Sequence, residues 1–123
     1  MKTYDAQGNL IDSTTISQIQ RKLAFSTTTP LGASAVYTSP TISDALSYRR
    51  IVLMVYSDQS ITVHGEHSLD GIAWRRGTGS STAANTASII DIVLSTPFFR
   101  VVLINGATPT TVLQSAGYLS PLT

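Results

Sequence analysis

From residue 32 onwards, hydrophobic and polar positions alternate in short runs that are separated by turn residues. Runs rich in β-branched and aromatic residues predict strands at 32–38, 48–56, 61–68, 72–76, 87–95, 98–104 and 110–119. Asn105-Gly106 is a strong hairpin signal between the last two. No long helical pattern lies between the runs, so they predict an all-β fold, an antiparallel β-sandwich or jelly roll over residues 32–123.

Two of these strands do not alternate. The run from Ile51 to Tyr56 is continuously apolar, and 98–104 is interrupted only by Arg100. A strand with one wet face alternates apolar and polar residues, because neighbouring side chains point to opposite faces. Both faces of these strands are therefore predicted to be covered. The pattern leaves three covers open: the rest of the domain with the N-terminal segment as a lid, another subunit, or a host surface.

Residues 1–31 are predicted to form an extended N-terminal arm rather than part of the sandwich. Gln7-Gly8-Asn9 is typical of a turn, and Pro30 favours an extended connector. Ile16, Ile19 and Leu23 have the spacing of a short amphipathic helix. The apolar side chains of the arm that we expect to contact a partner are Ile11, Ile16, Ile19, Leu23 and Phe25.

Composition narrows the function classes. Only 12% of the residues are charged, about half the usual share, and the net charge is +1, too small for a general nucleic-acid binder. The absence of cysteine excludes disulfides and thiolate metal sites. No apolar run is long enough to cross a membrane, and the N-terminus has no signal-peptide pattern, so synthesis in a cytoplasm is expected.

Candidate chemistry is sparse. His64 and His67 are predicted to lie on opposite faces of one strand, which disfavours a shared metal, and no cofactor is expected. The segment 77–81 is rich in glycine and serine but lacks the lysine and helix of a phosphate-binding loop. No nucleophile elbow is present, so no catalytic residue is assigned and the chain is not expected to be an enzyme.

Among the carboxylates, Asp58 and Asp70 lie in predicted turns, where aspartate side chains bind nearby backbone. Asp91 is different because it lies in the middle of the strand at 87–95. A carboxylate that faces inward needs a partner, and Arg100 in the next predicted strand is the candidate. We therefore predict an ion pair between Asp91 and Arg100, across two strands or across a subunit boundary.

The segment Ser68-Leu69-Asp70-Gly71-Ile72-Ala73-Trp74 is similar to the S-x-D-G-x-x-W hairpin of discoidin-like carbohydrate-binding sandwiches. In such a hairpin, Asp-Gly makes the turn and the tryptophan packs behind it. The resemblance covers seven residues and implies a sandwich more strongly than sugar binding. It leaves an alternative function, a carbohydrate-binding module of a phage tail or secreted enzyme, in which Trp74, Tyr56 or Tyr48 stacks on sugar rings.

The overall layout resembles the small structural proteins of tailed-bacteriophage virions, and most closely the capsid decoration, or cementing, proteins. The features are the polar arm, the Ser/Thr-rich β-domain, and the lack of cysteine, signal peptide and catalytic motif. The resemblance implies a homotrimer on the capsid surface, made in the host cytoplasm. Its partners would be the major capsid protein and copies of itself, with the arm bridging neighbouring subunits and no role for nucleic acid or membrane.

Overall fold

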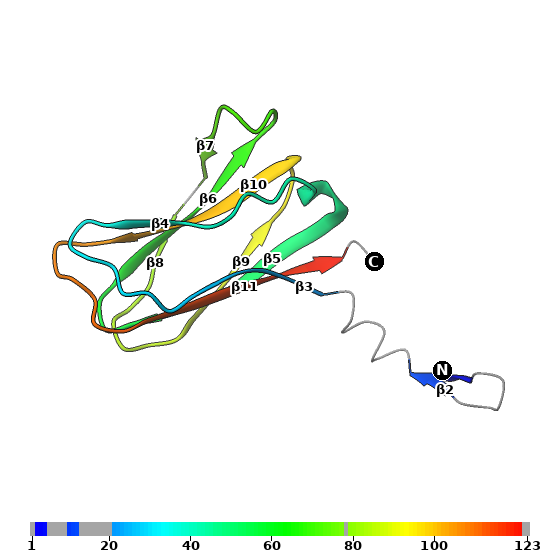
Figure 1. Ribbon diagram of the computed structural model, residues 1–123, viewed down its shortest axis with the longest axis horizontal. Helices are drawn as coiled ribbons and strands as arrows, with labels where there is room; N and C mark the ends of the chain where they lie inside the picture. Colours follow the sequence, from blue (N-terminus) through cyan, green and yellow to red (C-terminus); the bar gives the residue numbers. More distant parts are fainter. Residues whose placement is uncertain (1, 5–9, 13–20, 78, 122–123) are drawn as a thin grey trace.

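The computed structural model describes residues 2–4, 10–12, 21–77 and 79–121, and it contains two antiparallel β-sheets packed face to face (Figure 1). This confirms the predicted all-β sandwich. A single 3₁₀ turn, η1 (Ala45–Ser47), is the only helical element in these ranges. No helix among them has the length and apolar character needed to cross a membrane.

One sheet has the strand order β4-β10-β6-β7, with β8 also paired to β6, and the other has the order β3-β11-β5-β9. The bounds of the first sheet are β4 (Val36–Thr38), β6 (Ile61–Ser68), β7 (Arg75–Arg76), β8 (Ser80–Ser81) and β10 (Phe98–Asn105). Those of the second are β3 (Lys22–Thr27), β5 (Tyr48–Ser57), β9 (Ser88–Val93) and β11 (Leu113–Pro121). A separate two-stranded ladder joins β1 (Lys2–Tyr4) to β2 (Leu10–Asp12).

The core lies between the two sheets and is built from alternate residues of the long strands. These buried side chains include Ile51, Leu53 and Val55 of β5, Ile61 and Val63 of β6, and Phe99, Val101 and Leu103 of β10. Gly65 of β6 has a specific role here, because a Cβ at this position would lie 2.7 Å from Cε1 of Phe99. The glycine leaves the space that the Phe99 ring occupies.

The predicted boundary of the arm at residue 31 is wrong, because the sandwich begins at Lys22. Residues 22–27 form β3, which pairs with β11 and places Phe25 beside Gly117. Phe25 is 4% exposed, and a Cβ at Gly117 would lie 2.6 Å from its ring. Leu31 also belongs to the core. The predicted helix positions Ile16 and Ile19 lie outside the described residues.

The predicted hairpin at Asn105-Gly106 is also wrong, because the strands on either side of it belong to different sheets. β10 pairs with β4 and β6, whereas β11 pairs with β3 and β5. Nδ2 of Asn105 donates hydrogen bonds to the carbonyl oxygens of Leu31, Gly32 and Thr108. These bonds fasten the segment 106–112 where it crosses from one sheet to the other.

Candidate binding surfaces

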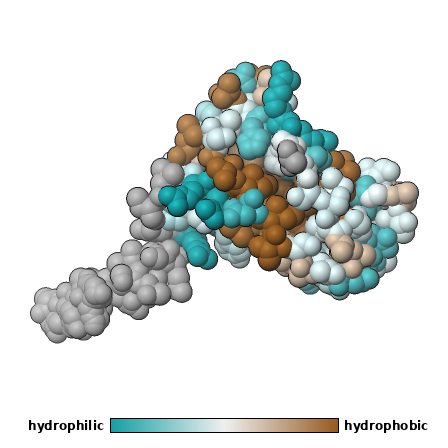
Figure 2. Space-filling model, turned by 180° about the vertical axis from the view of Figure 1, so that it is seen from behind, coloured by the Kyte–Doolittle hydropathy of each residue, from teal (hydrophilic) through white to brown (hydrophobic). Residues whose placement is uncertain are grey.

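The outer side of the four-stranded sheet carries a patch of apolar side chains around the ion pair of Arg50 and Asp91. We call it the apolar face and define it by Leu23, Val52, Met54, Ile89, Val93 and Tyr118. The strand register joins these residues, because Tyr118 lies opposite both Leu23 and Val52, and Met54 lies opposite Ile89. Ile89 and Val93 are 68% and 66% exposed. Figure 2, seen from behind, shows apolar surface in the middle of the body, where Figure 1 places β9.

The continuously apolar run in β5 explains this face. Alternate residues of β5 point into the core and are buried, whereas Val52 and Met54 point outward and stay half-buried. The other apolar strand, β10, behaves differently, since Val102 on its outer side is only 1% exposed. The prediction that both faces of these strands are covered is therefore confirmed for β10, where the chain itself buries Val102. It is not met within the chain for β5, whose outer face stays accessible.

Asp91 lies on the apolar face and pairs with Arg50, not with Arg100. The Arg50 Nη1 to Asp91 Oδ2 distance is 2.8 Å, and both side chains are partly exposed. β9 and β10 follow one another in sequence but belong to opposite sheets. The predicted pairing of Asp91 with Arg100 within the chain is therefore wrong, because the segment 94–97 crosses the sandwich instead of forming a hairpin.

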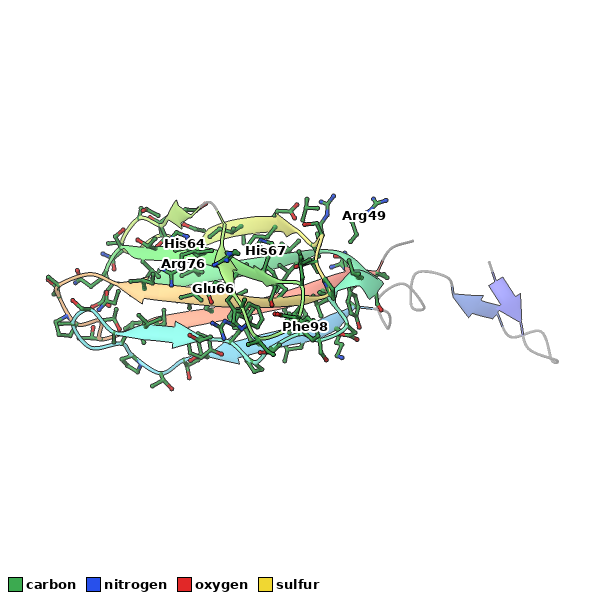
Figure 3. All side chains as sticks on the ribbon, turned by 90° about the horizontal axis from the view of Figure 1, so that it is seen from above. Arg49, His64, Glu66, His67, Arg76 and Phe98 are labelled. Carbon is green, nitrogen blue, oxygen red and sulfur yellow. The ribbon has the colours of Figure 1, made fainter. Side chains whose placement is uncertain are left out.

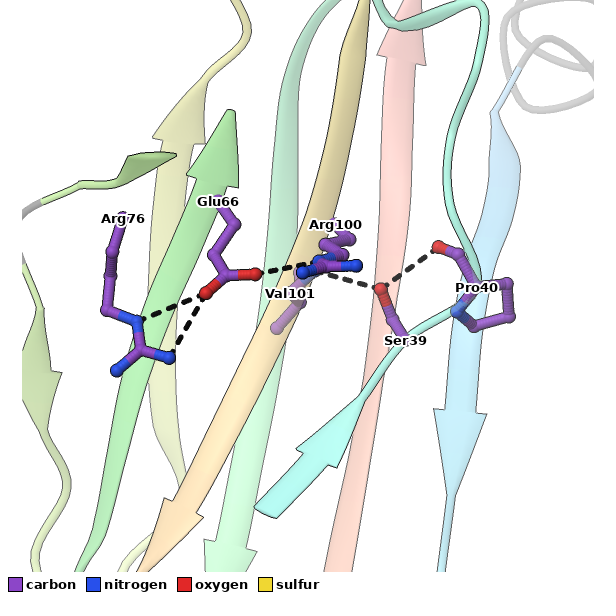
Figure 4. Close-up of polar contacts among 6 residues, drawn as sticks. All are labelled: Ser39, Pro40, Glu66, Arg76, Arg100 and Val101. Carbon is purple, nitrogen blue, oxygen red and sulfur yellow. Dashed lines mark hydrogen bonds and ion pairs between the residues drawn. The ribbon is translucent and has the colours of Figure 1, made fainter. Parts of the chain in front are cut away.

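The outer side of the five-stranded sheet carries charged side chains, where the other sheet carries aliphatic ones. Glu66 accepts a hydrogen bond from Nε of Arg100 at 2.7 Å on one carboxylate oxygen. Its other oxygen accepts from Nε and Nη2 of Arg76 at 3.2 and 3.1 Å (Figure 4). The register of β7, β6 and β10 places the three residues in one row. We call this row, together with Trp74, the ionic face.

The charges of the ionic face are satisfied internally. The Glu66 side chain is only 10% exposed, and burial alone would raise its pKa. The hydrogen bonds and charges of Arg100 and Arg76 outweigh burial, so the pKa of Glu66 lies below its ordinary value. The guanidinium of Arg100 also lies 4.1 Å from the centroid of the Trp74 ring, a cation–π contact.

Beside the ionic face, Ser39 connects the end of β4 to β10. Its Oγ accepts a hydrogen bond from the backbone N–H of Val101 at 2.8 Å and donates one to the carbonyl of Pro40 at 3.1 Å (Figure 4). The backbone N–H of Ser39 donates in turn to the carbonyl of Val101. These bonds hold the chain against β10 after β4 ends.

The hairpin between β6 and β7 is held by the side chains of Ser68 and Asp70. Oγ of Ser68 accepts a hydrogen bond from the N–H of Gly71 at 2.8 Å. Oδ1 of Asp70 accepts from the N–H groups of Ile72 and Ala73 at 2.8 and 2.9 Å. The backbone bonds from Ala73 and Ile72 and the hydroxyl of Ser68 lower the pKa of Asp70. These bonds confirm the predicted role of Asp70, whose side chain binds the backbone of the turn.

Asp58 fastens two loops at the opposite end of the sandwich. Its carboxylate accepts hydrogen bonds from the hydroxyl and the N–H of Thr111 and from the N–H of Val112, the shortest at 2.6 Å. The Thr111 hydroxyl makes the largest contribution to lowering the pKa of Asp58. The arrangement is a structural clamp of the kind that turn aspartates supply.

The two histidines project from opposite faces of β6, as the spacing predicted. His67 faces the core side, where its ring lies 5.1 Å from that of Phe99, and burial lowers its pKa. His64 lies on the outer side, with Nδ1 3.1 Å from the carbonyl oxygen of Gly77. Figure 3 places both beside Glu66. Within the described ranges, no three His, Asp or Glu residues are grouped so that they could hold a metal ion.

The predicted partner contacts of the arm separate into three groups. Phe25 is a core residue, so its predicted role in contacting a partner is wrong. Leu23 is half-exposed on the apolar face and stays a candidate. Ile11 lies in β2, opposite Thr3, while Ile16 and Ile19 lie outside the described residues. Sequence reasoning missed Ile89 and Val93, although the apolar run in 89–94 was the available signal.

By its fold, this protein is an antiparallel β-sandwich with one apolar and one ionic outer face. Comparison with known families then assigns it to one of them. The chain belongs to the family described as "Uncharacterised protein YqxG N-terminal domain", whose model matches residues 12–116. No curated protein matches the chain.

Solved structures share the fold at low sequence identity. The PBSX exported protein XepA is similar with a TM-score of 0.74 and 16% identity, over 100% of this chain and 49% of that chain. The chain therefore spans about half the length of XepA. PirA has a TM-score of 0.53 and 8% identity, over 78% and 93% of the two chains. A protein of the disulfide-linked pili of Bacillus endospore appendages has a TM-score of 0.53 and 12% identity, over 84% and 88%.

Proposed function

We propose that this chain is a non-enzymatic structural protein of a bacteriophage particle, and that it works by burying its apolar face against neighbouring subunits. The observation that carries the proposal is the patch of outward-facing aliphatic and aromatic side chains on β3, β11, β5 and β9, which surrounds the ion pair of Arg50 and Asp91. Contiguous exposed apolar surface of this kind marks interaction sites in proteins. The fold likeness to an exported protein of phage PBSX supports the phage assignment.

In its finer form, the proposal places the protein on the outside of the capsid after synthesis in the host cytoplasm. There it binds the major capsid protein and copies of itself, as a homotrimer, and bridges neighbouring capsid subunits. Apolar burial contributes about 25 cal/mol per Å², and many weak contacts on one shell act together through multivalency. The low content of charged residues favours such contacts over nucleic-acid binding.

Co-sedimentation with purified particles of the phage that encodes the chain tests the proposal. The double variant Ile89→Ser with Val93→Ser should lose binding to particles, because it makes the apolar face polar. Val36→Ser is the matched control, since Val36 is 52% exposed but lies on β4 of the other sheet. Equal binding by the wild type and the double variant, or no binding by the wild type, contradicts the proposal.

A carbohydrate-binding role is the second candidate, and Trp74 is the observation that favours it. The ring is half-buried and lies among polar groups on the ionic face, although Arg100 contacts one side of it. Glycan-array binding that is present in the wild type and absent in Trp74→Ala would support this role. Silence of the wild type on the array removes it.

A further inference from the structure

The hairpin between β6 and β7 exposes two aliphatic side chains at its tip. Leu69 and Ile72 are 78% and 84% exposed, which makes them the most exposed large apolar residues in the described part of the chain. Figure 1 shows the hairpin projecting beyond the neighbouring strand β10. We call Leu69, Ile72 and the exposed Arg75 the tip surface. It lies apart from the apolar face, which belongs to the other sheet.

The tip surface is preorganised. The side chains of Ser68 and Asp70 accept the backbone N–H groups of the turn. Gly71 adopts a φ of +79°, which favours glycine, and a Cβ there would lie 3.3 Å from the ring of Phe98, which supports the turn from behind. A rigid loop loses little conformational entropy when it binds, so exposed groups held in this way are suited to docking.

A cleft of 390 Å³ lies at the base of the hairpin, between it and the segment that connects β9 to β10. The residues around this cleft are His67, Ser68, Leu69, Asp70, Ala73, Arg75 and Thr96. Arg75 forms no ion pair with any residue in the described ranges, unlike Arg76, which binds Glu66. The cleft thus combines room for an apolar side chain with a cation that lacks a carboxylate.

Charge is distributed unequally along the sandwich. Every one of the eight lysines and arginines except Lys2 lies at or near the end where β3 and β5 begin and β6 ends. They are Arg21, Lys22, Arg49, Arg50, Arg75, Arg76 and Arg100. The loops at the opposite end, 28–35, 57–61, 77–87 and 105–112, contain Asp58 and no lysine or arginine. Asp44, Glu66, Asp70 and Asp91 lie at the same end as the seven cations, so the cations there outnumber the carboxylates by three. The end that carries the tip surface therefore has the excess of positive charge that attracts acidic groups.

Two features favour a protein over a lipid surface as the occupant. Arginine dominates the basic end, and arginine is the cation that binds carboxylates with two parallel hydrogen bonds and is enriched at protein interfaces. Asp70 lies between Leu69 and Ile72 in the sequence, with its carboxylate bound to the backbone of the turn. Insertion of this tip into hydrocarbon would bury an ionised carboxylate, at a large cost in free energy.

We propose that the tip surface and its cleft form a second interaction site, which takes an apolar side chain flanked by carboxylates from a protein partner. The apolar side chain fills the cleft between Leu69 and Ala73, and Arg75 binds a flanking carboxylate. This site is independent of the apolar face, so the protein can contact two different surfaces at once.

The test uses two peptides, acetyl-Asp-Asp-Leu-Phe-Asp-Asp-amide and the same sequence with lysine in place of aspartate. Amide chemical shifts of the full chain are followed by NMR. We expect the acidic peptide to shift the amides of residues 69–75 and 96, and the lysine peptide to leave them unchanged. Arg75→Glu should weaken binding at least about tenfold, the scale of one lost charge-assisted contact. Arg21→Glu, which reverses an exposed charge just before β3 of the other sheet, should weaken it far less.

Three results overturn the proposal. One is that the acidic peptide leaves the amides of residues 69–75 unchanged, and another is that Arg75→Glu and Arg21→Glu weaken binding equally. The third is that vesicles of phosphatidylglycerol shift these amides while the acidic peptide does not, which would assign the tip to a lipid surface. None of these results bears on the apolar face, which the particle-binding experiment tests separately.

Discussion

The two outer faces of this sandwich differ in whether their side chains are already bonded within the chain. On the ionic face, Glu66 and two arginines satisfy one another, and Trp74 lies against one of the arginines. On the apolar face, aliphatic and aromatic side chains remain exposed, with one ion pair among them. A face whose polar groups are already bonded gains little from a partner, whereas exposed apolar area is stabilised only when something covers it.

The first prediction compares the carboxylates of the two faces. Glu66→Ala should lower the free energy of unfolding by about 2 kcal/mol, because it leaves Arg100 partly buried without its partner. Asp91→Ala removes the exposed ion pair with Arg50 and should cost less than about 0.5 kcal/mol. Urea unfolding of both variants checks this. Equal losses would show that the ionic face stabilises the fold no more than the exposed pair does.

Acidification should weaken the sheet that carries the ionic face. The pKa of His67 in the folded state lies below its ordinary value of 6.5, and that of Glu66 below its ordinary value of 4.5. In both cases the unfolded chain binds protons more readily, so stability falls as the pH drops below each ordinary value towards the folded one.

The pH dependence can be assigned by substitution. Thermal melts from pH 8 to pH 3 should show a first loss of stability below pH 6.5 that disappears in His67→Phe. A second loss below pH 4.5 should shrink in Glu66→Gln. Part of this second loss of stability should persist in Glu66→Gln, because the pKa values of Asp58 and Asp70 are also lowered in the folded state. A melting temperature that stays constant across this range would contradict the assignment.

Trp74 provides a smaller effect on the same face. Trp74→Leu keeps an apolar side chain but removes the ring beneath the Arg100 guanidinium, and should cost about 0.5–1 kcal/mol. The double variant Trp74→Leu with Arg100→Leu should cost less than the sum of the two single losses. Additive losses in urea unfolding would mean that ring and guanidinium do not stabilise one another.

The smallest effect on stability is expected on the apolar face. Leu23→Thr and Ile89→Thr keep β-branched or strand-compatible side chains and should change the free energy of unfolding by no more than about 0.5 kcal/mol each. Native mass should nevertheless fall to that of a single chain if this face holds copies together. A decrease in stability without any change in native mass would instead indicate that these side chains serve the fold.

The sequence predicted the parts of the fold that depend on local pattern. Alternation located β6 and its two faces, and the turn signal Asp70-Gly71 located the hairpin between β6 and β7. Composition of the runs located β5, β9 and β10 within a few residues. In each case the determining interactions lie within the segment itself or its adjoining turn.

Errors arose where the answer depended on pairing between distant segments. Phe25 looked like an arm residue because its neighbour Gly117 is far along the chain. Asp91 and Arg100 looked like neighbours because their strands are consecutive, yet the chain crosses between sheets there. The row of Arg76, Glu66 and Arg100 was missed for the same reason. Only the register of β7, β6 and β10 brings these residues together.

The position of β9 at the border of its sheet limits how this protein can associate. Its outer backbone groups have no neighbouring strand among the described residues, and such borders invite the addition of further strands. Asp91 interrupts the isoleucines and valine of β9 with a charge at the centre of that border. If two copies paired antiparallel through β9 with Asp91 at the centre of the register, the two carboxylates would lie opposite each other, which is destabilising. This charge disfavours pairing of two copies through their β9 borders, so contact through the apolar face is the favoured way for copies to associate.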